Sequence, residues 1–319
     1  IRGNSLYAIV DGPSWTQAEA NAVSLGGHLI SVSDSEENAF AQGVANKYFD
    51  GVPYYMDGSQ KYYLRDGKEQ SSDIWIGLFE NNGVEGAWSW ASGEPVTYID
   101  TSGLGDDNGT QDYGAIRDVW SWSWDDQEDV DTLNYLYGRA DVRYSSKVGM
   151  AEIPFIRRGD SAYVIVQGPT WEAAEANAIA LGGHLATVND AQENQWIVDN
   201  FGNKGVSGLW IGLNDIRTEG EWEWAGGGVS TYRNWGTSEP SNGGPLGEDY
   251  VHIWSDNSWN YPVPGARDLG YWNDAPNDPS GWTEGRMFGG LVEIRLASNN
   301  APTGKPTLNS VSKAGDTLS

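Results

Sequence analysis

Apolar residues recur with a helical period in two stretches near the start of the chain, each next to a short run typical of a strand. Residues 7–10 predict a short strand, and Gly12-Pro13 turns the chain after it. A helix is expected from residue 14 or 15 to Leu25, because one stripe of that segment is apolar. The stripe consists of Trp15, Ala18, Ala22 and Leu25. Gly26-Gly27 then provides the C-terminal cap.

A second, shorter helix is expected to begin near Asp34, where Asp34-x-x-Glu37 resembles an N-terminal capping arrangement. The residues that follow change in character. Trp-rich segments read as short strands separated by long loops, with Trp75-Ile-Gly-Leu as a buried central strand. The pattern predicts an α+β fold.

The same pattern occurs twice. Residues 5–40 align without a gap with residues 161–196, and 21 of these 36 positions are identical. Later landmarks match in the same order: Trp75-Ile-Gly-Leu with Trp210-Ile-Gly-Leu, Trp88-x-Trp90 with Trp222-x-Trp224, Gln111-Asp-Tyr with Glu248-Asp-Tyr, Trp124-Asp-Asp with Trp272-Asn-Asp, and Ala151-Glu-Ile with Val292-Glu-Ile. So many landmarks in one order indicate a duplicated domain. We expect domains at residues 1–157 and 158–297, then a linker and the start of a further module at 298–319.

The amino-acid composition of the chain excludes several classes of function. With 45 acidic and 19 basic residues the formal charge is −26, which disfavours a nucleic-acid partner. No apolar run approaches 18 residues, so we expect no membrane insertion. The absence of Cys removes disulfides, zinc–thiolate sites and thiol catalysis together. Seventeen Trp, sixteen Tyr and 42 Gly instead favour a loop-rich fold with an aromatic core.

The segment from Glu239 to Asp274 gathers side-chain oxygens. They belong to Glu239, Ser241 or Asn242, Glu248, Asn273 and Asp274. Calcium takes six to eight hard oxygen ligands and accepts both carboxylates and amides. An amide whose oxygen holds the metal still offers an N–H donor, so a ligand hydroxyl can touch metal, carboxylate and amide together. The segment therefore predicts calcium-dependent sugar binding.

With these motifs in this order, the chain resembles the C-type lectin-like domain over residues 5–155 and 161–297. The resemblance implies two tandem domains, each with two helices, short antiparallel strands and a long calcium-binding loop region. Animal relatives staple that loop with disulfides, whereas Tyr250 and Pro276 lie near the expected cysteines here. The cysteine-free form is typical of bacterial members.

Carried over residue by residue, the resemblance implies a principal calcium site at Glu239, Glu248, Asn273 and Asp274. Ser241 and Asn242 both remain candidates for the third motif position. The resemblance also implies a cis bond before Pro240 and a preference for mannose-, fucose- or glucose-type sugars. The implied auxiliary site contains Asp215 and Glu219, with Asn242, Glu248 and Asp249 nearby.

Two triplets compete for the last motif. Trp259-Asn260-Tyr261 lies at the usual distance from Asp249, but only Trp272-Asn273-Asp274 has the required carboxylate. We favour the later triplet and interpret residues 259–268 as an insertion that rims the site. Trp259 is then a candidate sugar contact, and Trp272 and Trp282 are further candidates for stacking on a sugar face.

The first copy lacks the complete set of calcium- and sugar-binding residues that the second copy has. Its Glu94-Pro95 imitates the motif, but its distance from the Trp pair aligns it with Gly227-Gly228. Gln111 replaces Glu248, and Asp125 replaces Asn273. Asp106, Asp107, Asn108, Asp125 and Asp126 are left either as a structural calcium site or as a solvated acidic loop. The role of residues 54–72, which have no counterpart in the second copy, is open.

We therefore expect a secreted or cell-surface lectin, part of a larger adhesin, in which calcium in the second domain binds a carbohydrate or glycoconjugate. The alternative is a protein-binding or structural module in which calcium only stiffens the loop. An enzyme is not expected, because no Ser-His-Asp order, phosphate-binding Gly loop or zinc spacing occurs.

Overall fold

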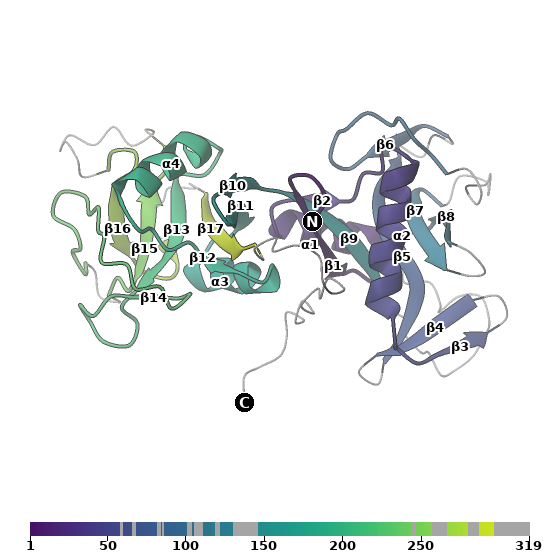
Figure 1. Cartoon of the computed structure of the whole chain (residues 1–319), viewed down its shortest axis with the longest axis horizontal. Coiled ribbons are helices and arrows are strands. Elements are labelled where there is room, and N and C mark those ends of the chain that lie inside the picture. The colour runs from purple at the N-terminus through teal and green to yellow at the C-terminus, as the bar shows by residue number, and fades with distance from the viewer. Residues whose placement is uncertain are drawn as a thin grey trace. The chain divides into compact units, whose positions relative to one another are not determined.

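The chain folds into two compact units, and the main boundary between them along the sequence lies between Ile153 and Pro154 (Figure 1). The computed structural model describes residues 1–57, 60–65, 68–81, 84, 86–100, 104, 111–118, 122–129, 146–243, 247–256, 267–279 and 287–296. We call residues 1–153 the first unit and the residues from 154 onward the second unit. The predicted domain limits at 157 and 297 stay predictions, and residues 298–319 lie outside the described part.

The second unit is built around one sheet, which has eight strands among the described residues. Its main path runs β10-β11-β17-β13-β15-β16, with β12 paired to β17 and β14 to β13. The strands are β10 Ile156–Arg158, β11 Ser161–Gln167, β12 His184–Leu185, β13 Gly208–Asn214, β14 Glu223–Trp224, β15 Tyr250–Trp254, β16 Trp272–Ala275 and β17 Phe288–Arg295. All these pairs are antiparallel except β13 with β17, which is parallel. The prediction of short antiparallel strands is thus confirmed apart from this central pair.

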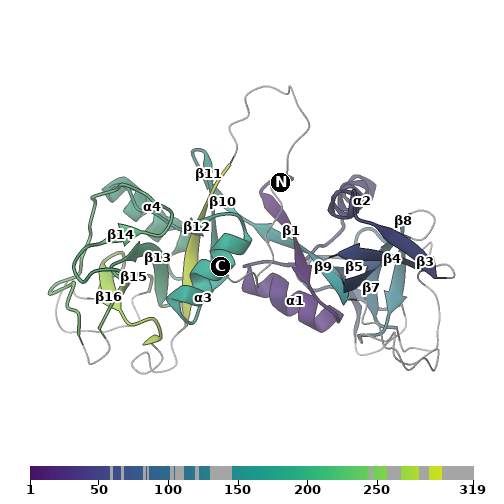
Figure 2. The ribbon, with the colours of Figure 1, turned by 90° about the horizontal axis from the view of Figure 1, so that it is seen from below.

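Two helices, α3 (Trp171–Ala180) and α4 (Ala191–Phe201), cover opposite faces of this sheet (Figures 1 and 2). Successive side chains of a strand alternate between faces, so Trp210 of β13 packs with α3 while Leu209 and Ile211 pack with α4. Both helices begin at an N-terminal cap, of which the one at Asp190 repeats the arrangement expected at Asp34. The Thr170 hydroxyl accepts the Ala173 N–H at 3.1 Å, and the Asp190 carboxylate accepts the Glu193 N–H at 2.8 Å.

The first unit repeats this plan with α1 (Trp15–Ser24) and α2 (Ser35–Phe49). Its sheet has nine strands among the described residues, and the main path is β1-β9-β5-β4-β3. The strands are β1 Ser5–Asp11, β2 His28–Leu29, β3 Tyr54–Asp57, β4 Gln60–Arg65, β5 Lys68–Glu80, β6 Trp88–Trp90, β7 Tyr113–Asp118, β8 Trp122–Gln127 and β9 Ser146–Pro154. The extra segment 54–72 forms β3, β4 and the start of β5, so it extends the sheet as an antiparallel hairpin. No described helix is long and apolar enough to cross a membrane.

Tryptophan indoles link the same elements in both units. Trp75 and Trp210 each donate to a backbone oxygen at 3.1 Å, namely that of Gly12 or Gly168. Trp124 and Trp272 are fully buried, and they donate to the amide oxygens of Asn38 and Asn194 at 2.9 and 2.8 Å. These bonds tie β8 to α2 and β16 to α4 in a chain that has no Cys. They confirm the prediction of an aromatic core.

Strand registers give the residue correspondence between the units. Tyr113 pairs with Phe79 in the first unit as Tyr250 pairs with Asn214 in the second. Because β8 and β16 pair in the same register, Asp125 corresponds to Asn273 and Asp126 to Asp274. The predicted position of Glu94 is wrong by one residue. Gly93 and Gly227 both have positive φ and donate to Trp90 and Trp224 at 2.9 Å, so Glu94-Pro95 corresponds to Gly228-Val229.

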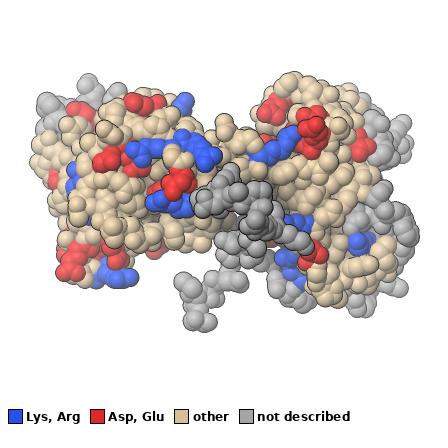
Figure 3. Space-filling model, in the orientation of Figure 1, with Lys and Arg blue, Asp and Glu red and all other residues tan. Residues whose placement is uncertain are grey.

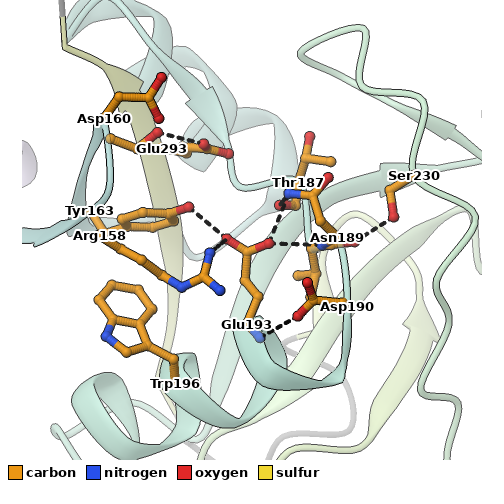
Figure 4. A network of polar contacts seen from close by, with 12 residues as sticks. Arg158, Asp160, Tyr163, Thr187, Asn189, Asp190, Glu193, Trp196, Ser230 and Glu293 are labelled. Carbon is orange, nitrogen blue, oxygen red and sulfur yellow. Dashed lines mark hydrogen bonds and ion pairs between the residues drawn. The ribbon is translucent and has the colours of Figure 1, made fainter. Parts of the chain in front are cut away.

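A buried carboxylate holds α4 against β11 in the second unit (Figure 4). Glu193 accepts hydrogen bonds from Arg158 Nη1 at 2.9 Å, Tyr163 Oη at 2.8 Å, and both the backbone and side-chain nitrogens of Asn189 at 2.8 Å. Lys and Arg side chains lie over β10 and β11 on the face shown in Figure 3, and Arg158 belongs to β10. Glu37 forms the equivalent contacts with Arg2, Tyr7 and Ser33.

Candidate functional site

The loop that carries Glu239 is anchored to β16 by its own backbone. Gly236 N donates to Trp272 O at 2.8 Å, and Trp272 N donates to Asn234 O at 2.9 Å. Three residues later the Glu239–Pro240 peptide bond is cis, as predicted. The loop thus starts from the same short strand that carries Asn273 and Asp274.

Asp274 organises the loop after Pro240. Its side chain is only 1% exposed. Oδ1 accepts the Ser241 N–H at 2.9 Å, and Oδ2 accepts the Asn242 N–H at 2.7 Å. A carboxylate that accepts two backbone N–H groups fixes the direction of the chain between them.

Glu248 closes the loop from the other side. Its Oε2 accepts the Ser241 hydroxyl at 2.9 Å and the Gly243 N–H at 2.6 Å. Its own N–H donates to Asn242 Oδ1 at 3.0 Å. Ser241 and Asn242 therefore both contact the Glu248 residue, and the structure leaves both as candidates for the third motif position. No feature of the sequence indicated that the Gly243 N–H would donate to this carboxylate.

Negative charge accumulates around Glu239. Burial is the main cause that raises the pKa of Glu239 to about 7, and the neighbouring Asp274 and Glu248 carboxylates raise it further. The pKa of Glu248 is also raised, first by burial and then by the charge of Asp274, against the opposing bonds from Gly243 and Ser241. Glu239 Oε2 is buried and accepts no hydrogen bond from the described residues. A bound cation would relieve both the repulsion and the unpaired oxygen.

A second acidic group lies where β13 ends. Asp215 is 2% exposed; its Oδ2 accepts the Gly220 N–H at 2.8 Å, while Oδ1 is buried without a partner among the described residues. Asp215 N donates to Asp249 O at 3.1 Å. Burial raises the pKa of Asp215, and the charges of Asp249 and Asp274 add to it. Partial desolvation and the same carboxylates raise the pKa of Glu219. Asp274 therefore acts electrostatically on both acidic groups.

Asn273 is oriented differently from its neighbour. Its Nδ2 donates to the Asp274 backbone oxygen and lies 3.3 Å from His252 Nε2. Among the described residues it makes no hydrogen bond with the carboxylates around Glu239. Complete burial lowers the pKa of His252 to about 3, so this imidazole is neutral. The strand register opposite His252 was the signal that could have revealed this contact.

Of the three tryptophans predicted to contact sugar, the described residues include Trp272. Trp272 is fully buried in the core, so its predicted role in stacking on a sugar is wrong. The triplet Trp272-Asn273-Asp274, which we favoured over Trp259-Asn260-Tyr261 as the last motif, lies in β16 and pairs with β15. Trp259 and Trp282 lie outside the described residues, as do Asp106, Asp107 and Asn108.

The donors around Glu239 and Asp215 suit calcium in chemical type. They are carboxylate, amide and hydroxyl oxygens, which are hard ligands. Within the described residues, no three acidic or histidine side chains already converge as a preformed metal centre. The residues thus fit a calcium ion by their chemistry and by the unpaired buried oxygens of Glu239 and Asp215.

Comparison with known families gives the decisive observation. The model of the family described as "Lectin C-type domain" matches residues 11–139 and 167–263, more than half of the chain. The chain belongs to the C-type lectin domain family. Members of this lectin family bind carbohydrates and glycoconjugates and generally bind Ca²⁺. The second match ends before β16, so it includes Glu239 and Glu248 but not Asp274.

Similar lectins and receptors come from animals. C-type mannose receptor 2 of Rattus norvegicus is 24% identical over 278 residues, which are 84% of this chain and 16% of the receptor. A perlucin-like protein of Mytilus galloprovincialis is 34% identical over 110 residues, 33% of this chain and 69% of that protein. This C-type lectin chain thus spans only a small part of the mannose receptors it matches. The relatives are secreted or cell-surface proteins of non-enzymatic families, and the predicted bacterial type has no support among them.

Two solved structures align with less than half of this chain. The mouse scavenger receptor C-type lectin carbohydrate-recognition domain is 25% identical, covers 44% of this chain and 95% of that domain, and has a TM-score of 0.35. A calcium-independent type II antifreeze protein is 22% identical, covers 44% of this chain and 91% of its own, and also has a TM-score of 0.35.

Proposed function

We propose that the second unit binds a carbohydrate through a calcium ion held by Glu239, Glu248 and Asp274. Ser241, Asn242 and Asn273 complete the proposed site. The observation that carries this proposal is the half-buried carboxylate of Glu239, whose Oε2 is buried without a hydrogen-bond partner among the described residues and whose pKa is raised to about 7 by burial and by the Asp274 and Glu248 carboxylates. Such a group is stabilised far better by a divalent cation than by water.

When bound, the ion supplies direct coordination of two adjacent sugar hydroxyls. The chain itself contributes hydrogen bonds: the Glu239 and Glu248 carboxylates accept from sugar hydroxyls, and the amides of Asn242 and Asn273 donate to them. Asn273 must turn away from the Asp274 carbonyl to do so. We propose Asp215, Glu219 and Asp249 as an auxiliary calcium site that stiffens the same loop.

The proposed ligand class is mannose-, fucose- or glucose-type. It follows from Glu239-Pro240, and it agrees with the name of the mannose receptors among the relatives. A shallow site of this kind binds single sugars at roughly the millimolar level, about −4 kcal/mol. Useful adhesion then needs several copies, which fits our proposal of a larger secreted or cell-surface adhesin.

A second candidate is a calcium-stabilised protein-binding or structural module. The observation in its favour is that the side chains of Ser241, Asn242 and Asn273 already form hydrogen bonds with other groups of the protein. In that case calcium would raise the melting temperature, and sugar would have no further effect.

A glycan array probed with and without a calcium chelator separates the two functions. We expect binding to multivalent mannose- or fucose-type glycans in calcium and its loss in chelator. The Glu239→Gln variant should lose this binding and retain its fold by circular dichroism. If calcium raises the melting temperature but no glycan binds in either buffer, the carbohydrate proposal fails and the structural module stands.

Calcium affinity should rise with pH between about 6 and 8. The pKa of free Glu239 is about 7, and calcium binds the ionised form, so binding must release this proton at lower pH. The affinity should fall up to about tenfold for each pH unit below 7 and level off above 8. Isothermal titration in two buffers of different ionisation enthalpy measures both affinity and proton release.

Without calcium, the contribution of Glu239 to folding stability should instead decrease as the pH rises. Because the folded pKa of Glu239 is raised, its contribution to stability is fully present below the unfolded value near 4.5 and is lost as pH rises through about 7. Glu239→Gln should flatten both profiles. An affinity that does not vary between pH 6 and 8 would contradict the assignment of Glu239 as a ligand.

A further inference from the structure

The side chains around Asn273 and their counterparts in the first unit differ in a coordinated way. Strand registers match β7, β8 and β9 to β15, β16 and β17 position by position. The matched pairs are Gly208 and Asp73, His252 and Ala115, Trp254 and Arg117, Asn273 and Asp125, Ala275 and Gln127, and Phe288 and Lys147. Every one of these positions changes in chemical character.

In the second unit this cluster is uncharged and aromatic. The His252 ring lies 4.4 Å from Trp254, 4.9 Å from Phe288 and 5.6 Å from Trp210, each measured between ring centroids and near perpendicular. The Asn273 amide lies against the same imidazole. Edge-to-face packing of this kind stabilises the cluster, and the Arg267 guanidinium lies over the Trp254 ring, 5.6 Å from its centroid.

In the first unit the same positions form an ionic network. Arg117 Nη1 lies 2.8 Å from Asp125 Oδ2, and Arg117 Nε lies 3.6 Å from Asp73 Oδ1. Gln127 Nε2 donates to both Asp73 Oδ2 and Asp125 Oδ2 at 3.0 Å, and its Oε1 accepts from Lys147. The Lys147 ammonium lies 4.2 Å from the centroid of the buried Trp75 ring. The Gln127 amide thus contacts both carboxylates and the Lys147 ammonium, while Arg117 lies beside the same two carboxylates.

We propose that the first unit keeps its fold without calcium, because Arg117 and Lys147 supply positive charge to the Asp73 and Asp125 carboxylates, and Asp125 occupies the register position of the motif residue Asn273. Asp125 stands at the Asn273 position, but its carboxylate is already paired with a guanidinium. Two cations around it repel a further divalent ion. In addition, Gln111 stands where Glu248 contributes a carboxylate in the second unit. The ionic network therefore supports β7 and β8 where β15 and β16 have the aromatic cluster around His252, and it does so without a metal.

Hydrogen exchange of the full chain, read by mass spectrometry, tests this inference independently of sugar binding. Peptides from residues 111–118 and 122–129 should exchange at the same rate in calcium and in chelator. Loss of their protection in chelator would overturn the proposal.

Two variants show whether the charge of Arg117 matters. Arg117→Met leaves Asp73 and Asp125 with only Lys147, so we expect exchange in these peptides to be faster by on the order of tenfold or more. Arg117→Met combined with Asp125→Asn leaves one carboxylate and one cation, and it should recover most of the protection. Wild-type protection in the single variant, or a double variant as fast as the single one, would overturn the proposal. Should the single variant unfold the first unit, the double variant still decides.

Discussion

Replacing Asp274 with alanine should abolish calcium-dependent ligand binding by the second unit. The side chain is buried, it orients the backbone of Ser241 and Asn242, and its charge acts on both acidic groups. Its loss removes a proposed ligand and leaves two N–H groups without their acceptor. We expect calcium affinity to fall by on the order of a hundredfold or more, about 2.7 kcal/mol. Titration calorimetry measures the affinity, and glycan binding in calcium measures the function.

The first unit offers a matched control. Asp126 occupies the same register position as Asp274 and is likewise a buried residue. Asp126→Ala should leave calcium-dependent glycan binding unchanged. Asp274→Asn, which keeps the shape of the side chain and one acceptor oxygen, separates loss of charge from collapse of the loop. A full calcium response in both Asp274 variants would show that the ion binds elsewhere.

The fold was predictable because its signals are local or repeated. Asp34 and Asp190 cap their helices as their spacing to Glu37 and Glu193 indicated. The apolar stripe beginning at Trp15 and its repeat at Trp171 pack as expected against the sheet. The error of one residue at Glu94 was one of counting: Gly93 and Gly227 each lie three residues after the second Trp of the pair, and both have positive φ.

The site was less predictable because neighbouring residues of a strand point to opposite faces. The motif Trp272-Asn273-Asp274 reads as a single unit in sequence. In the structure Asp274 bonds to the loop while the Asn273 amide lies against His252. Likewise, Arg117 and Lys147 lie 30 positions apart, and only the register of three strands brings their charges to Asp125 and Gln127. Tertiary pairing, not local pattern, determines these contacts.

Replacing Glu193 with alanine should strongly destabilise the second unit. This carboxylate is 1% exposed and is the common acceptor of Arg158, Tyr163 and Asn189. Without it a guanidinium, a phenol and two amide donors lose their partner (Figure 4). Breaking a buried ion pair by removing one member costs about 3–5 kcal/mol, and the third of the Arg158 side chain that stays exposed favours the lower end.

The loss of stability should extend to the proposed calcium site. The adjacent Asn194 on α4 accepts the Trp272 indole N–H and donates to Gly270 O at 3.0 Å. Urea unfolding followed by hydrogen exchange assigns the lost stability to a unit. Glu37→Ala is the matched control: it removes the equivalent contacts with Arg2 and Ser33, so it should destabilise the first unit and spare the second. The double variant Arg158→Met, Glu193→Met removes both charges and should recover a large part of the loss. A cost below about 1 kcal/mol for Glu193→Ala would mean that the network in Figure 4 contributes no more than an exposed ion pair.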